Sequence, residues 1–375
     1  MKSIGYKPQL DGLRCMAVLA VLFHHFWQTD TGVGLIGVRL FFVLSGFLIT
    51  TMLLSAKELI ESDASTVLRS FKQFYIRRSL RIFPAFYLVV VIGWLAGVPE
   101  VASPIWWHLT YTTNILFVRQ GYLDAHTAHL WSLAVEEQFY LVWPFVVLLV
   151  PRRVLIPITA ALVIAAPLVR VAVVLLTLDG RTFFLLPIGA MDSLGSGALL
   201  ALLRPTRWHR RFCALGLVSF AAAVTLAVSG RTDAVFFDTI LSLGFGWVVA
   251  KAFDGFHGLP GQIFELAPVR YLGKISYGIY LYQGFVPLLL SSSFGYFAIS
   301  TSLAPSGRFF VLASMVTVGL ASVSWHLYEK HWNALKGRLS DSFSSAVTPT
   351  SAADSAALPV GGEMKLSDEQ VGVTT

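Results

Sequence analysis

The sequence predicts an all-α fold: a polytopic transmembrane helical bundle of about ten helices with both termini in the cytoplasm. The first observation behind this prediction is composition, since 55% of the residues are hydrophobic and only 13% are charged. Soluble chains carry about a quarter charged residues, and a mean hydropathy of +0.69 excludes an ordinary soluble globule. The second observation is a series of apolar stretches, each near the length that crosses a hydrocarbon core of about 30 Å.

The third observation is the placement of positive charge, which is retained on the cytoplasmic side of short loops. Ten candidate spans alternate across the membrane, at approximately 10–28, 33–54, 83–98, 130–150, 154–177, 186–203, 211–229, 233–252, 271–291 and 308–329. With a cytoplasmic N-terminus, most Lys and Arg residues fall on inside connections. The outside connections hold only Arg119, Arg181, Arg231 and Arg308.

The domain organisation follows from the same pattern. Residues 1–335 are expected to form one transmembrane domain, and residues 336–375 turn Ser/Thr/Ala-rich and read as a disordered cytoplasmic tail. The first span is expected to act as an uncleaved anchor. Cys15 and Cys213 are too few for a disulfide framework. The net charge of +7 reports membrane topology, and nucleic acid is not expected as a partner because no recognition motif is present.

The first span holds Arg14 near its start and His25 near its end, eleven positions apart. In an α-helix this spacing brings the two side chains to within about 20° of one face, separated by roughly 16 Å of depth. Ionisable groups inside a membrane-length segment are costly and mark functional sites by default. The alternative is structural, with Arg14 as an interfacial anchor and His25 as a lumen-facing histidine.

Four motifs carry a family resemblance: QLDGLRCMAVLAVLFHHF (9–26), GVRLFFVLSGFLIT (37–50), FKQFYIRRSLRIFPAFYL (71–88) and HLWSLAVEEQFYLVWP (129–144). In this order they resemble the membrane acyltransferase-3 family, bacterial inner-membrane enzymes that O-acylate cell-surface or secreted carbohydrates. Looser matches at 191–202, 269–285 and 322–332 extend the resemblance over about residues 6 to 332. The family's first-span arginine and histidine fall on Arg14 and His25, and its RxxxR motif falls on Arg77 and Arg81.

The resemblance implies an O-acyltransferase that moves an acyl group, most often acetyl, from cytoplasmic acyl-CoA to a carbohydrate hydroxyl. Such a donor carries several phosphate charges at one end and a thioester at the other. Arg77 and Arg81 are neighbours on one helical face and, with Arg78, form an expected clamp for the donor phosphates, since guanidinium groups bind phosphate in bidentate fashion. Arg14 is expected to help to hold or admit the donor. The alternative for this cluster is the ordinary positive-inside signal.

The catalytic prediction places His25 as the general base for the acceptor hydroxyl and Glu136 as the carboxylate that orients it, because both residues are expected at one outer level. Of the adjacent carboxylates, the family pattern favours Glu136, so Glu137 is expected to contact substrate or cap the helix. Arg39 has two readings: it stabilises the developing oxyanion, or it neutralises a buried carboxylate. Gln283 stands where the family often has histidine, and an amide cannot act as a base at neutral pH.

The acceptor is expected to be an exopolysaccharide, lipopolysaccharide or related glycan, with Trp131 and Ser132 on its path. Aromatic belts at membrane interfaces are a competing explanation for Trp131. No metal is expected, because the histidines of the region 108–129 have irregular spacing. The lipid bilayer and polysaccharide-assembly proteins are the other expected partners. The alternative function is a multi-pass transporter or flippase of a glycan or lipid-linked intermediate; such proteins commonly show an inverted repeat, and none is visible here.

Overall fold

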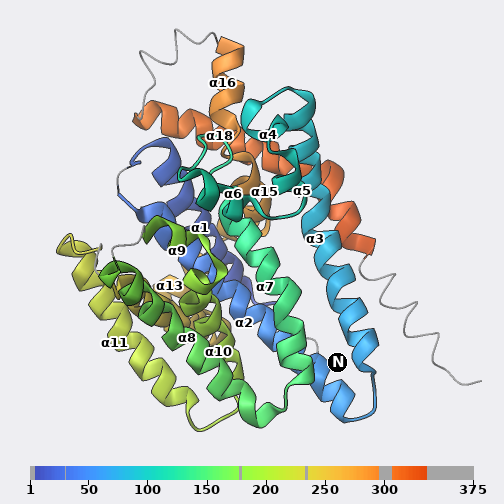
Figure 1. The fold of residues 1–375 in the computed structure, drawn as a ribbon, viewed down its shortest axis with the longest axis vertical. Helices are drawn as coiled ribbons and strands as arrows, with labels where there is room; N and C mark the ends of the chain where they lie inside the picture. Colours follow the sequence, from blue (N-terminus) through green and yellow to red (C-terminus); the bar gives the residue numbers. More distant parts are fainter. Residues whose placement is uncertain (1–4, 30, 177–179, 233–234, 295–305, 336–375) are drawn as a thin grey trace, which may run out of the picture. The chain divides into compact units, whose positions relative to one another are not determined.

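The computed structural model describes residues 5–29, 31–176, 180–232, 235–294 and 306–335, and the predicted tail from residue 336 lies outside these ranges. Within them, every regular element is helical (Figure 1). The helices are α1 Pro8–Phe26, α2 Val33–Glu61, α3 Val67–Leu95, α4 Pro99–Ala102, α5 Ile105–Leu109, α6 Thr113–Gln120, α7 Leu130–Leu149, α8 Arg152–Leu175, α9 Gly180–Leu185, α10 Met191–Leu203, α11 His209–Val228, α12 Phe237–Asp254, α13 Gly258–Glu265, α14 Ala267–Lys274, α15 Ser276–Tyr282, α16 Val286–Phe294 and α18 Gly307–Ser324, with a 3₁₀ turn at Pro187–Ala190 and a π-helical turn at Trp325–Glu329.

Six described helices are long and apolar enough to cross a membrane: α2, α3, α7, α8, α11 and the segment Gly307–Leu335. The prediction of an all-helical, multi-pass membrane protein is therefore confirmed as a class. The number of ten spans and the cytoplasmic placement of the termini stay predictions.

Two expected spans differ from the helices that form. The expected span 83–98 is the second half of α3, which begins at Val67, because the basic segment before it continues the same helix. The expected span 271–291 is broken into α14, α15 and α16. Two histidines hold the break: His129 Nε2 donates to the Leu281 carbonyl (3.0 Å), and His126 Nδ1 lies 3.3 Å from the Gly284 carbonyl oxygen. Non-helical backbone is tolerated at membrane depth where protein satisfies it.

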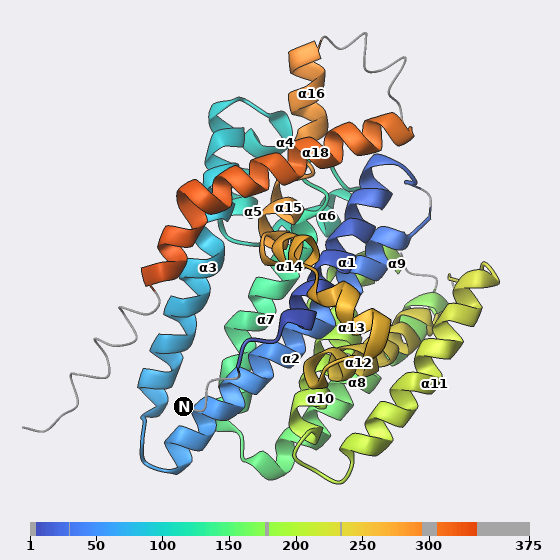
Figure 2. The same cartoon turned by 180° about the vertical axis from the view of Figure 1, so that it is seen from behind.

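Helix α2 is the central element of the bundle, and α1, α7 and α10 pack against it (Figures 1 and 2). It runs parallel to α7, because Trp143 Nε1 donates to Thr50 Oγ1 (2.8 Å) and, further along both helices, Lys57 Nζ donates to the Leu148 and Val150 carbonyls (3.1 and 2.8 Å). The ammonium of Lys57 thereby satisfies carbonyls at the end of α7 that no helical N–H reaches.

Glycines allow α2 and α10 to approach to backbone contact. A methyl group added at Gly46 would overlap the Leu194 carbonyl, and one at Gly197 would overlap the Val43 carbonyl. Small residues at such crossings are the usual means of close helix packing in membranes.

Gly46→Ala is expected to destabilise the bundle by about 1–3 kcal/mol, because the backbone of α10 must move to accept the methyl group. The measurement is thermal unfolding of the detergent-purified protein. Gly319→Ala on α18 is the matched control, since a methyl group there meets nothing within 4 Å. Equal unfolding midpoints for the two variants would contradict the packing assignment.

Candidate active site

A cavity of about 580 Å³ lies between α1, α2, α3, α7 and α15. On α2 its lining runs from Val38 to Ser55, a length of about 26 Å along the helix axis. The sequence-predicted residues that line it are Arg14, Arg77, Arg78, Arg81, Ser132, Glu136 and Glu137. The structure therefore brings together both basic motifs and the fourth-span carboxylates, which lie far apart in the sequence.

The arginines form the basic part of this cavity. Arg14 donates to Asp11 (2.6 Å), and the Arg78 guanidinium lies over the Tyr140 ring, 4.2 Å from its centroid. Arg81 is exposed although it lines an interior cavity, and it forms no hydrogen bond or salt bridge with the described residues. Guanidinium groups that face open space in a cavity are suited to bind an anion such as phosphate.

The carboxylates are held differently from each other. The Ser45 hydroxyl donates to Glu136 Oε1, and the Tyr140 hydroxyl donates to Ser45 Oγ (3.0 Å). Within the described part of the chain, the Oε1 atom of Glu137 is buried and has no hydrogen-bond partner. Ser45 and Tyr140 were missed by sequence reasoning, although both lie inside the motifs that carry the family resemblance.

Two hydroxyls mark one end of the cavity, beside Phe41 of α2. Tyr280 packs edge-on against Phe41, with ring centroids 6.1 Å apart, and its hydroxyl oxygen lies 2.5 Å from Ser132 Oγ. Both hydroxyls also reach the His129 carbonyl, at 3.1 Å from Ser132 and 3.2 Å from Tyr280.

His25 lies beyond this end of the cavity and does not line it. Its chain neighbour His24 packs against Gly34, whereas Tyr280 meets Phe41 and Glu136 meets Ser45. Along α2, the level of His25 is therefore about 10 Å from that of Tyr280 and about 16 Å from that of Glu136. The expected common level of His25 and Glu136 is not found, and Glu136 belongs with the arginines.

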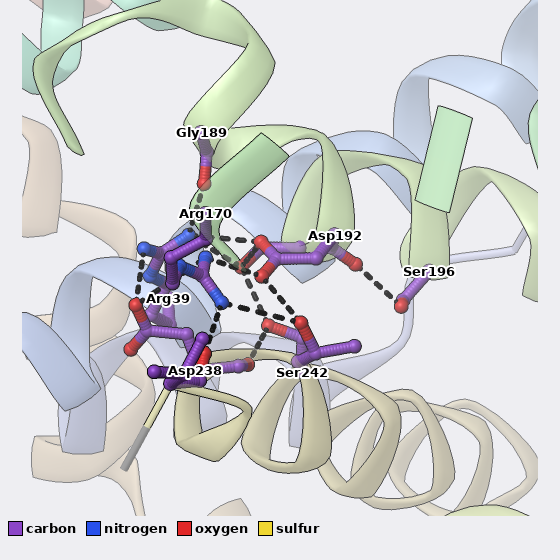
Figure 3. Close-up of polar contacts among 10 residues, drawn as sticks. Arg39, Arg170, Gly189, Asp192, Ser196, Asp238 and Ser242 are labelled. Atoms are coloured by element: carbon purple, nitrogen blue, oxygen red, sulfur yellow. Dashed lines mark hydrogen bonds and ion pairs between the residues drawn. The ribbon is translucent and has the colours of Figure 1, made fainter. Parts of the chain in front are cut away.

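Arg39 lies in a separate, buried ion cluster that joins four helices (Figure 3). Its guanidinium donates to Asp192 of α10 (2.9 Å) and to Asp238 of α12 (2.8 Å). Arg170 of α8 contacts the same two carboxylates, at 2.9 and 3.6 Å. The geometry favours the second reading of Arg39, neutralisation of buried carboxylates, because all these groups are paired with one another.

Trp131 does not line the cavity. It is buried and packs against Phe42 and Phe184, with ring centroids 6.0 and 4.4 Å apart. A fully packed indole has no free face for a sugar ring in this structure. Tyr280 is the residue at this end that sequence reasoning missed, and its motif SYGIYLY was the available signal.

Comparisons with known proteins find relatives that are similar to this chain over most of its length. The chain is 30% identical to a peptidoglycan O-acetyltransferase, OatA, of Listeria monocytogenes over 75% of this chain and 49% of that protein. It is 26% identical to the O-acetyltransferase OatA of Staphylococcus aureus over 88% of this chain and 57% of that protein. The chain thus spans about half the length of the curated relatives that it matches, and no solved structure matches it.

The family model described as an acyltransferase domain matches residues 7–326, which include every helix that lines the cavity. With a match over most of its length, this chain belongs to the acyltransferase-3 family.

Proposed function

We propose that the protein is an O-acetyltransferase of the bacterial inner membrane. It moves an acetyl group from cytoplasmic acetyl-CoA to a hydroxyl of a cell-surface glycan, with peptidoglycan as the first candidate. The observation that carries the proposal is the long cavity, which holds several arginines beside the middle of α2 and ends at two hydroxyls on the side of His25. Two relatives, named as O-acetyltransferases and one of them as acting on peptidoglycan, support the choice of the acetyl group and of the glycan.

The donor fits this cavity in one orientation. Its phosphates lie on Arg14, Arg77, Arg78 and Arg81, and its pantetheine arm leads from them to Ser132 and Tyr280. Glu136 and Glu137 border the arm, and they limit the surplus positive charge of the cavity. The thioester then lies at the end of the cavity that faces His25. The acceptor hydroxyl arrives there from the side of the membrane opposite to the cytoplasm.

The reaction is direct transfer. His25 accepts the proton of the acceptor hydroxyl as its oxygen forms a bond to the thioester carbonyl carbon. The C–S bond then breaks, and the protonated His25 returns a proton to the CoA thiolate. The products are an O-acetyl ester and free CoA. No covalent acyl-enzyme is needed.

Membranes that contain the protein, given acetyl-CoA labelled in the acetyl group and a peptidoglycan acceptor, test this proposal. We expect label in alkali-labile ester linkage on the glycan and release of free CoA, both dependent on the protein. A transporter or flippase would leave the thioester intact, and that result would overturn the proposal.

Arg81→Gln is expected to raise the KM for acetyl-CoA about tenfold, because one charge-assisted contact to phosphate is worth about 1.5–3 kcal/mol. The KM for S-acetyl-pantetheine, which carries no phosphate, should stay unchanged. Arg152→Gln, at a surface pair with Glu61, is the matched control. An equal rise in KM for acetyl-CoA and for S-acetyl-pantetheine would show that Arg81 does not contact the phosphates.

A further inference from the structure

The Ser132–Tyr280 pair consists of two hydroxyl groups that can donate hydrogen bonds during acyl transfer. The inference drawn from it rests on the proposed function. Three oxygen–oxygen contacts join Ser132 Oγ, the Tyr280 hydroxyl and the His129 carbonyl, but the two hydroxyls supply only two hydrogens. One contact in this triangle therefore lacks a hydrogen at any moment. Ser132 and Tyr280 both line the cavity, so a ligand at this end of it lies next to the pair.

One of these hydrogens can be redirected at little cost. Both hydroxyls contact the His129 carbonyl, so this carbonyl keeps one hydrogen bond when the other hydroxyl donates to a ligand. A charged acceptor can draw both hydrogens, because hydrogen bonds to an ionised oxygen are about twice as strong as those between neutral groups.

The surroundings hold Tyr280 in place from several sides. The His129 ring packs edge-on against the Tyr280 ring, with centroids 5.8 Å apart, and its Nε2–H donates to the carbonyl of the next residue, Leu281 (3.0 Å). Added bulk at Gly284 would overlap the His129 ring. His129 and Tyr280 are therefore locked together, and the hydroxyl position is fixed before a substrate binds, as electrostatic stabilisation requires.

The depth of the pair also suits the reaction. The level of Tyr280 lies about 10 Å along α2 from that of His25. A hydrogen bond of about 2.8 Å at each end and an attack distance of about 3 Å together span about 9 Å. An acceptor hydroxyl on His25 and a thioester carbonyl on the Ser132–Tyr280 pair therefore fit in line between them.

We propose that the Tyr280 and Ser132 hydroxyls form the oxyanion site of this enzyme. When the acceptor oxygen bonds to the carbonyl carbon, the carbonyl oxygen becomes negatively charged, and both hydroxyls donate to it. When the C–S bond breaks, the oxygen returns to a neutral ester carbonyl and the hydroxyls keep their protons. Tyr280 and Ser132 are catalytic residues in this account, and His129 is a positioning residue.

Tyr280→Phe is expected to lower kcat by about 10²-fold, the usual effect of removing one oxyanion donor, with little change in the KM for acetyl-CoA. Ser132→Ala should act in the same direction. The double variant should lose less than the product of the two single losses, since the hydroxyls act on one oxygen. Tyr282→Phe is the matched control, because its hydroxyl donates to Ser324 Oγ (2.7 Å) and does not line the cavity.

A spectroscopic measurement separates catalysis from folding. The probe is a non-hydrolysable ketone analogue of acetyl-CoA with a ¹³C carbonyl, observed by isotope-edited infrared spectroscopy on the full-length protein. We expect the wild-type protein to shift the carbonyl band to lower frequency than in water, and Tyr280→Phe to reverse most of that shift while retaining analogue binding.

The outcomes are distinct. Binding of the analogue with the same band in wild type, Tyr280→Phe and Tyr282→Phe would overturn the oxyanion site and leave the proposed function standing. A wild-type protein that binds neither the analogue nor acetyl-CoA would overturn the proposed function itself. Loss of kcat in Tyr282→Phe equal to that in Tyr280→Phe would assign the effect to packing.

Discussion

His25→Ala is expected to lower the single-turnover rate of acetyl transfer by about 10²–10⁴-fold, with a normal amount of protein in the membrane. The physical reason is the loss of the group that takes the acceptor proton, and general-base contributions have this size. Binding of acetyl-CoA should persist, because the arginines that hold the phosphates lie in the cavity about 16 Å or more from the level of His25. The measurement is rapid-quench transfer from labelled acetyl-CoA with saturating glycan.

His25→Gln is a second variant for this prediction, since it keeps polarity and approximate size but cannot accept a proton. His24→Ala is the control on the neighbouring position, about 100° away around the helix. Near-wild-type transfer in His25→Ala at normal abundance would remove His25 from the mechanism. The same loss in His24→Ala would assign the effect to the end of α1 as a whole.

Arg39→Met is expected to produce the largest loss of stability among single substitutions of charged residues, about 3 kcal/mol. The substitution leaves Arg170 alone to neutralise Asp192, which is fully buried, and Asp238. A buried charge that loses its partner pays its full desolvation cost. Thermal unfolding in detergent, followed by size-exclusion chromatography, measures the effect.

Arg152→Gln is the matched control for this prediction. Its guanidinium is 43% exposed and pairs with Glu58 and Glu61 at the surface, where an ion pair is worth about 0–1 kcal/mol. If Arg39→Met unfolds at the same temperature as Arg152→Gln yet has lost all transfer activity, the structural assignment of Arg39 is wrong. That result would favour the alternative in which Arg39 stabilises the developing oxyanion.

The class of the protein and part of the donor cavity could be predicted from sequence. Composition alone identified a helical membrane protein, since the cost of burying charge in lipid leaves few alternatives. The motifs indicated Arg14, Arg77 and Arg81 as one group, and the structure shows that these three residues line one cavity. The buried pair of Arg39 and Asp192 could not be predicted, because the two residues lie 153 positions apart and no periodicity in the sequence reveals their contact.

The depth of the fourth-span carboxylates could not be predicted. The expectation of one level for His25 and Glu136 assumed that each span begins at the same membrane plane. In the structure α7 begins deeper than the end of α1, since Trp131 in its first turn packs against Phe42 while His24 lies beside Gly34. The break in 271–291 escaped prediction for a related reason. The histidines that satisfy its backbone, His126 and His129, come from a distant segment.

The central claim is that one donor molecule lies along α2, with its phosphates on the arginines and its thioester at the Tyr280 end, facing His25. A cryo-electron microscopy structure of the protein with the non-hydrolysable acetyl-CoA analogue tests it most directly. We expect phosphate oxygens within hydrogen-bond distance of Arg81 and at least one of Arg14, Arg77 and Arg78, and a carbonyl oxygen within about 3 Å of the Tyr280 hydroxyl. An analogue bound outside this cavity, or with its carbonyl beside Ser55 at the opposite end, would contradict it.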